Sequence, residues 1–341
     1  MDIKIIKTDN SSCETFVCSK NDGKICHLPS FSNVVADATG HRSFYLVAYD
    51  CDHICGILPL IRVYSRLFGN RMISQAFSTY GGMLFDSKEA CDALFNRAIE
   101  LAMKFNCESI EFRNIKPLPY ELKLRTGKVC MHFPLHSDPD EIWKSFLPKV
   151  RNQVRKAEKS NITATNGGAE LLDDFYRLYT IRMRQLGTPG YPRSLMYNIL
   201  RQFKDNSRIF LVRHDNLTVG AAFTICYNSF AEIPWAATLI EYNKLCPNNL
   251  LYWSVIKHYC LTGAKFFDFG RCTVDGSTYR FKKQWGAKPI ELHYQYWVHP
   301  DHELSIASPD NPRYQKKVQI WKKLPLSVTR LLGPYISRNL P

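Results

Sequence analysis

One order of predicted elements occurs twice along the chain: several strands, then a helix, then one more strand. The first copy lies between Ser43 and Arg113, and the second lies between Ile209 and Phe269. Runs rich in β-branched and aromatic residues mark the strands, and helical spacing of apolar residues marks the helices. Such an order packs helices against a sheet. We therefore predict an α/β (α+β) fold with two similar units, each a mixed, mainly antiparallel sheet flanked by helices.

The length of 341 residues also favours two domains, because one hydrophobic core rarely organises so long a chain. Pro117 and Pro119 open a loop after the first copy of the pattern, and the next strand starts close to Lys128. We place the first domain at residues 1–128 and the second at residues 129–300. Residues 301–341 then form a separate C-terminal tail.

The chain carries 45 Lys and Arg against 31 Asp and Glu, which gives a net charge of +14. A surplus of this size favours polyanionic partners such as RNA, phosphorylated lipids or nucleotide-linked substrates. Part of it lies on a predicted helix that runs to Ser160, where Arg151 and Arg155 fall largely outside the apolar stripe. This basic face either contacts phosphates or is simply solvated.

The tail is the most basic part of the chain. From Asn311 onward it has no acid and seven basic residues: Arg313, Lys316, Lys317, Lys322, Lys323, Arg330 and Arg338. Leu331 and Tyr335 belong to an apolar stripe, and Pro334 is expected to bend or interrupt the helix. A basic amphipathic tail can lie on an anionic membrane, or it can pack against the second domain. The sequence leaves both readings open.

The absence of several motifs argues against some functional classes. Its 12 cysteines are scattered without a CxxC pair, so we predict no metal site and no disulfide framework. GxGxxG, GxxxxGK[ST], GxSxG and HExxH do not occur. We also expect no tightly bound cofactor. The N-terminus lacks the apolar region of a signal peptide and no apolar run could span a bilayer, which favours the cytoplasm.

The most distinctive stretch is Phe266–Arg271 followed by Tyr279–Gly286. On the strand, Phe267 and Phe269 share one face, and Asp268 lies on the other. The strand is expected to end near this acid, beside an arginine and shortly before two adjacent lysines. Such an arrangement can hold an anion and handle a proton. The alternative is a core strand with an ordinary ion pair beside it.

These residues resemble a known family. The Asp268–Arg271 run and the Phe281–Gly286 segment are similar to motifs of the Fem-type peptidyltransferases (FemABX) of the acetyltransferase-like (GNAT) superfamily, which have two tandem domains. The basic helix over Val150–Lys159 resembles a helix of the same family. With the Tyr80-Gly81-Gly82 loop, the resemblance is closest to a FemAB-like branch associated with PEP-CTERM/exosortase and exopolysaccharide loci. It covers about residues 40–300.

The resemblance implies tandem GNAT-like domains and an N-acyltransferase. The enzyme would transfer an acyl or aminoacyl group to an amine of a cell-envelope or exopolysaccharide precursor. Asp268 and Glu232 are the candidate bases or amine orienters, and Tyr279 is the candidate acid. The candidate substrate-binding residues, most of them able to hold phosphates, are Arg271, Lys282, Lys283, Trp285, Arg151, Arg155 and Tyr80. For Trp285 we favour a place in the core.

The acyl donor is expected to be a co-substrate: aminoacyl-tRNA, acyl-CoA or another acyl thioester. The long helical hairpin of the Fem proteins has no counterpart, because Leu171–Phe203 is too short and interrupted. The expected partners are a phosphorylated or lipid-linked envelope precursor, tRNA, and an anionic membrane contacted peripherally through residues 311–341. The alternative is a non-catalytic relative that binds anionic lipid or RNA.

Overall fold

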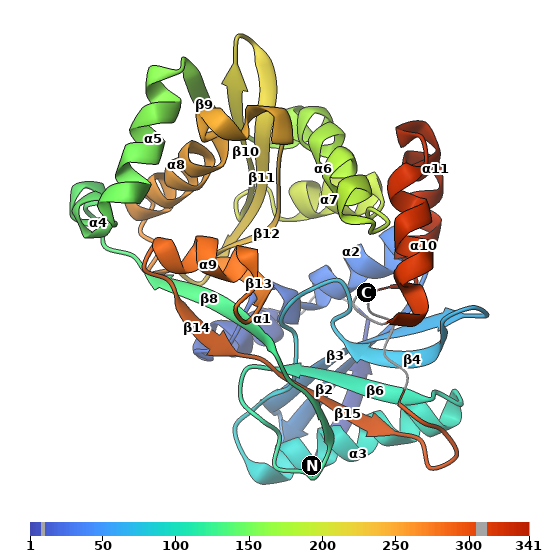
Figure 1. Cartoon of the computed structure of the whole chain (residues 1–341). Helices are drawn as coiled ribbons and strands as arrows, with labels where there is room; N and C mark the ends of the chain where they lie inside the picture. Colours follow the sequence, from blue (N-terminus) through green and yellow to red (C-terminus); the bar gives the residue numbers. More distant parts are fainter. Residues whose placement is uncertain (8–10, 305–311, 341) are drawn as a thin grey trace. The chain divides into compact units, whose positions relative to one another are not determined.

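The computed structural model describes residues 1–7, 11–304 and 312–340, and these fall into two compact units (Figure 1). The first unit contains Met1–Gly127 together with β15 (His293–Val298) and the last described residues from Arg338. The second contains Lys128–Ile290 together with the two C-terminal helices. The two units are described separately below.

The first unit is an eight-stranded sheet in the order β1-β2-β3-β4-β6-β15-β7, with β5 beside β3. Its strands, besides β15, are β1 (Asp2–Ile6), β2 (Arg42–Asp50), β3 (His53–Ser65), β4 (Gly69–Ser74), β5 (Leu84–Phe85), β6 (Ser109–Asn114) and β7 (Lys123–Arg125). Its helices are α1 (Ser11–Ser19), α2 (Pro29–Thr39) and α3 (Lys88–Lys104). Ser87 caps α3, since its side chain accepts a hydrogen bond from the Ala90 amide.

The second unit is a seven-stranded sheet in the order β14-β8-β13-β12-β11-β10-β9. Its strands are β8 (Lys128–Pro134), β9 (Ile162–Gly167), β10 (Ser207–His214), β11 (Leu217–Tyr227), β12 (Phe230–Thr238), β13 (Phe266–Thr273) and β14 (Lys288–Glu291). Its helices are α4 (Pro139–Ser145), α5 (Pro148–Lys159), α6 (Leu172–Leu186), α7 (Arg193–Gln202), α8 (Pro247–Leu261), α9 (Ser277–Gln284), α10 (Pro312–Lys323) and α11 (Leu326–Ser337).

The predicted repetition is present in the sheet topology. In each unit three antiparallel strands lead to one parallel pair, and a helix joins the two strands of that pair. The pair is β4–β6 with α3 in the first unit, and β12–β13 with α8 in the second. An antiparallel strand follows on the far side of each pair, β15 in the first unit and β8 in the second.

Two predicted boundaries differ from the structure. The second domain was placed at residues 129–300, but β14 belongs to the sheet of the second unit and β15 to that of the first. The second domain therefore does not continue to residue 300. The tail is not a separate element either, because α10 and α11 pack against α6 of the second unit.

The basic helix also differs from its prediction. It was expected as one helix through Ser160, but the structure has α4 and α5, with Phe146 and Leu147 in extended conformation between them. Pro148 explains the break, because a proline disfavours helical backbone in the residue before it and is well suited to the first turn of a new helix.

The core that positions the site lies on one face of the second sheet. It includes Val150 and Val154 of α5, Val255 of α8, and Phe267 of β13, all fully buried. Among the residues that the structure describes, no helix combines the length and the apolar content needed to cross a membrane.

Candidate active site

The parallel pair β12–β13 stays in register over only a short distance. The register ends with Glu232 opposite Asp268, although β12 continues to Thr238 and β13 to Thr273. The pairing of the two parallel strands therefore stops at two carboxylates.

Three strands bring three polar side chains together at this point. Glu232 and Asp268 lie on the sheet face opposite the core that contains Phe267 and Phe269, as predicted for Asp268. Asp268 is also in register with His132 on β8, whose Nε2 lies 3.9 Å from Asp268 Oδ2. We call Glu232, Asp268 and His132 the carboxylate cluster. Glu232 is 9% exposed and Asp268 is 0% exposed, so both acidic side chains lie in a poorly solvated region.

A β-bulge follows the cluster on β13. The register with β8 shifts between Asp268 and Arg271, and Gly270 has a φ of +80°. Asp268 Oδ1 accepts a hydrogen bond from the Gly270 amide at 2.8 Å. A Cβ at Gly270 would lie 3.0 Å from the carbonyl oxygen of Ile233. The bulge therefore needs glycine both for its backbone conformation and for the close approach of β12.

Lys282 holds the other side of this bulge. Its Nζ donates to the carbonyl oxygens of Gly270 at 2.7 Å and Arg271 at 3.2 Å. Burial lowers the pKa of Lys282, and the Arg271 charge acts in the same direction, while Cys272 and Asp268 oppose it. Predicted as a phosphate ligand, Lys282 is placed by the structure as a buried anchor of the bulge.

The two aromatic candidates on this motif differ from one another. Trp285 is 1% exposed and packs against the ring of Phe146, with a centroid distance of 5.0 Å. This is the core position that the sequence favoured. Tyr279 is buried on α9, and Lys283 Nζ lies 5.9 Å from the centroid of its ring. Its role as a proton donor stays a prediction.

The remaining basic candidates are arranged along the surface of the second unit. Arg271 and Lys283 are exposed, on β13 and α9. Arg155 is exposed on α5, with its guanidinium 5.5 Å from the ring centroid of Trp143. Arg151 is half-buried on the same helix. Their contact with a substrate stays a prediction.

The first unit has a carboxylate at the corresponding register of its own parallel pair. There β4 and β6 pair with Ile73 opposite Glu111. Arg113 Nε donates to Glu111 Oε1 at 2.7 Å, and both side chains are buried. Burial favours the neutral acid, but the charge and hydrogen bond of Arg113 outweigh it, so the pKa of Glu111 is lowered. Glu111 is thus a buried ion-pair partner.

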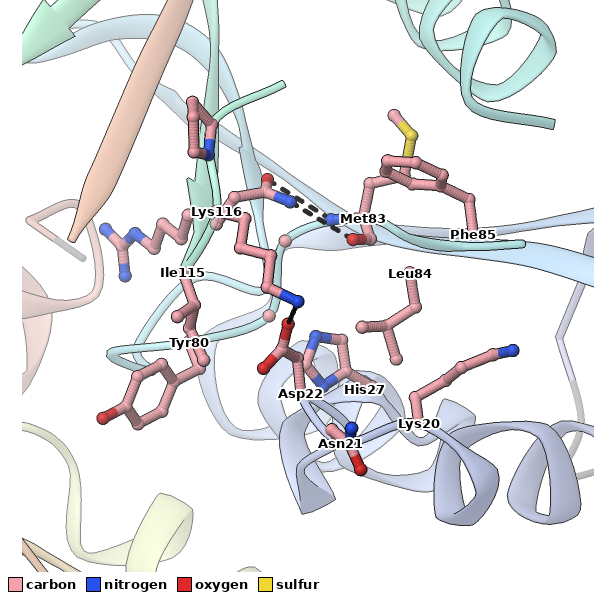
Figure 2. Close-up of a pocket in the computed structure, with 15 residues that line it drawn as sticks. Lys20, Asn21, Asp22, His27, Tyr80, Met83, Leu84, Phe85, Ile115 and Lys116 are labelled. Atoms are coloured by element: carbon pink, nitrogen blue, oxygen red, sulfur yellow. Dashed lines mark hydrogen bonds and ion pairs between the residues drawn. The ribbon is translucent and has the colours of Figure 1, made fainter. Parts of the chain in front are cut away.

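Tyr80, the candidate from the first unit, lines a cavity of about 270 Å³ (Figure 2). Lys116 lines it as well, and its Nζ lies 3.4 Å from Asp22 Oδ2. Lys20, also in the lining, forms an ion pair with Asp86. The cavity therefore has cationic side chains that are already partnered, and Tyr80 is 1% exposed beside them. Its assignment to substrate binding stays a prediction.

The loop that carries Tyr80 is held by backbone contacts. Arg113 Nη1 donates to the carbonyl oxygen of Ser78 at 2.5 Å, and the Tyr294 hydroxyl donates to that of Thr79 at 2.6 Å. The Gly82 amide donates to the carbonyl oxygen of Arg113 at 3.0 Å. These contacts fix the loop before any ligand arrives.

His27 adds a buried contact to the same loop, a contribution that the sequence did not reveal. Its Nδ1 accepts from the Lys24 amide at 3.0 Å, and its ring also makes a hydrogen bond to the backbone of Gly82. Burial and the Lys24 charge lower the pKa of His27 to about 3, although both hydrogen bonds oppose the shift. The ring is therefore neutral at physiological pH and has a fixed tautomer.

Comparison with known proteins agrees with this description. Residues 144–283, which include both carboxylates of β12 and β13, match the family model described as an acetyltransferase (GNAT) domain. The sequence matches none of the curated proteins with which it was compared.

Solved structures share the whole architecture. The crystal structure of FemX aligns over 94% of this chain and 100% of its own, with a TM-score of 0.69 and 17% identity. The C-terminal domain of a putative lysylphosphatidylglycerol synthetase from Agrobacterium fabrum aligns over 85% of this chain and 92% of its own, with a TM-score of 0.57 and 10% identity. A tandem GNAT protein from the clavulanic acid biosynthesis pathway aligns over 89% of this chain and 99% of its own, with a TM-score of 0.53 and 12% identity. The chain therefore has the tandem GNAT fold, as predicted.

Proposed function

We propose that this protein is an N-acyltransferase that moves an acyl or aminoacyl group onto an amine at the carboxylate cluster of the second unit. The observation that carries the proposal is the pairing of Glu232 and Asp268 at the point where β12 and β13 separate. The match of residues 144–283 to an acetyltransferase (GNAT) domain supports the reaction class.

The chemistry requires a neutral amine. A primary amine is mostly protonated at neutral pH, so a base has to remove one proton before the nitrogen attacks. We assign this role to Glu232, because its side chain is 9% exposed. Asp268 is fully buried and accepts a hydrogen bond from the Gly270 amide in the bulge. The amine nitrogen then bonds to the carbonyl carbon of the donor. As the bond to the leaving sulfur or oxygen breaks, Tyr279 is proposed to give its proton to the leaving group and to be reprotonated by the proton that the new amide nitrogen loses.

The donor is proposed to be an acyl-CoA, another acyl thioester or an aminoacyl-tRNA. All but the simplest of these donors carry phosphates, which Arg271 and Lys283 are positioned to bind from the exposed side of β13 and α9. Arg151 and Arg155 extend this basic surface along α5. We expect Arg271→Gln and Lys283→Gln to raise the KM for the donor more than they lower kcat.

The acceptor is proposed to be an amine-bearing envelope precursor, either phosphorylated or lipid-linked. Two structural neighbours, FemX and the lysylphosphatidylglycerol synthetase domain, support an envelope acceptor in general. The FemAB-like motifs also keep an exopolysaccharide precursor within the proposal. Tyr80 stays in the proposal as a substrate-binding candidate on the resemblance of its Tyr80-Gly81-Gly82 loop alone.

A transfer assay with the full chain tests the proposal. Acetyl-CoA and bulk aminoacyl-tRNA are supplied separately with a lipid-linked precursor fraction, and the products are identified by mass spectrometry. We expect Glu232→Gln to lower the rate by about 100-fold or more, the usual contribution of a general base. Donor binding, measured by calorimetry, should persist in this variant.

Asp275→Asn is a matched control, because Asp275 is an exposed carboxylate between β13 and α9. Its φ of +59° is one that asparagine tolerates. Its rate should equal that of the unmodified chain. If Glu232→Gln and Asp268→Asn both had the same rate as the unmodified chain, the site assignment would be refuted. A chain that binds neither donor but retains anionic lipid or RNA would instead be the non-catalytic relative.

A further inference from the structure

The C-terminal helix α11 packs against the second unit through its small side chains. Thr329, Gly333 and Ser337, each four residues from the next, are buried. Ser337 Oγ donates to the carbonyl oxygen of Gly190 at 2.9 Å. A Cβ at Gly333 would lie 3.3 Å from the backbone nitrogen of Gly190, so the helix backbone approaches closely. Arg330 Nε also donates to Thr180 Oγ1 at 3.0 Å.

The large apolar side chains of α11 lie outward. Leu331 and Tyr335 are 68% and 62% exposed, and Leu332 is 42% exposed. Leu331 is two residues from Thr329, which is about 200° around a helix. A surface helix of a soluble domain normally buries its large apolar residues and exposes its polar ones. On α11 this distribution is reversed.

The preceding helix α10 buries one apolar side chain, half-buries a second and exposes a third. Trp321 is 8% exposed, and Val318 lies against Gly187 at the end of α6. Ile320, two residues from Val318, is 60% exposed. Both helices are therefore anchored on one side and present isolated large apolar side chains on the other.

The exposed surface of these helices is basic as well as apolar. Residues 312–340 contain seven basic residues and no acidic residue. Lys316, Lys323 and Arg330 are exposed beside the apolar side chains. The surface of α10 and α11 thus combines exposed apolar groups with exposed basic side chains, the two features that an amphipathic segment uses on an anionic bilayer.

We propose that the exposed surface of α10 and α11, the α10–α11 surface, docks on an anionic phospholipid bilayer. Leucine and isoleucine side chains enter the boundary between head groups and acyl chains, while the lysines contact lipid phosphates. A second copy of the chain fits less well, because the same basic residues would face each other. The proposal does not depend on acyl transfer, so it stands or fails independently of the proposed function.

Vesicle sedimentation with the full chain tests this surface. The chain is mixed with vesicles of phosphatidylglycerol and phosphatidylcholine, or with vesicles of phosphatidylcholine alone. We expect binding to the anionic vesicles that weakens as salt is added. The double variant Ile320→Gln/Leu331→Gln should bind about tenfold or more weakly, because each side chain loses the transfer energy of an apolar group. Lys316→Gln/Lys323→Gln should lose about fivefold per lysine.

Leu261→Gln is the matched control, since Leu261 is 66% exposed at the end of α8 in the same unit. It should bind like the unmodified chain, and circular dichroism should show that all variants are folded. Equal binding by Ile320→Gln/Leu331→Gln and the unmodified chain would overturn the proposal. So would a monomer–dimer equilibrium in sedimentation that only this double variant abolishes, because a second copy would then occupy the surface.

Discussion

The buried imidazole of His27 predicts a specific acid sensitivity of the first unit. In the unfolded chain a histidine has a pKa of about 6.5, whereas burial lowers the pKa of His27 in the folded chain to about 3. Between these values the unfolded state binds more protons, so stability is present above pH 6.5 and is lost as the pH falls below it. Between pH 7 and pH 5, proton binding stabilises the unfolded state relative to the folded state by about 2 kcal/mol.

The measurement compares the unmodified chain with His27→Asn. Asparagine keeps an acceptor for the Lys24 amide but does not titrate, so the variant is less stable at pH 7 and loses about 2 kcal/mol less on acidification. Hydrogen exchange of β3 and β4 peptides in urea reports on this unit alone. His53→Asn, at the exposed start of β3, should retain the full loss. Equal losses in His27→Asn and the unmodified chain would refute the reasoning.

Three further substitutions test the packing around the two parallel pairs, each by urea unfolding of the full chain. Trp285→Ala should cost about 3–5 kcal/mol, because a fully buried indole leaves a cavity. Arg113→Met should cost about 3–5 kcal/mol by leaving Glu111 charged and buried, and Glu111→Gln/Arg113→Met should recover part of that loss. Lys282→Met should cost about 1–3 kcal/mol, because the carbonyl oxygen of Gly270 loses its buried donor. A change below about 0.5 kcal/mol in any of them would contradict the packing described.

Local patterns predicted those features that depend on neighbours in sequence. Alternation along β13 placed Phe267 and Phe269 in the core and Asp268 on the opposite face, because strand period alone determines this. The break before Pro148 was predictable from proline chemistry, yet the apolar stripe continued across it and suggested a single helix.

Long-range register was not predictable from local patterns. His132 lies on β8 and Glu232 on β12, and only the pairing of both strands with β13 brings them to Asp268. The two lysines of α9 show a second limit. Lys282 and Lys283 are equivalent in a motif, but one step along a helix turns a side chain by about 100°, so Lys282 is buried and Lys283 exposed.

The two units differ in the residue that follows the carboxylate of the parallel pair. Each has a carboxylate at the end of its parallel register, Glu111 in one and Asp268 in the other. On the regular strand β6, the residue two positions further lies on the same face, and there Arg113 pairs with Glu111. On β13 the residue two positions further is Gly270, which has no side chain and forms the bulge that displaces Arg271 by one residue. At the position of Arg113 in the first unit, the second unit therefore has a glycine whose backbone amide donates to Asp268.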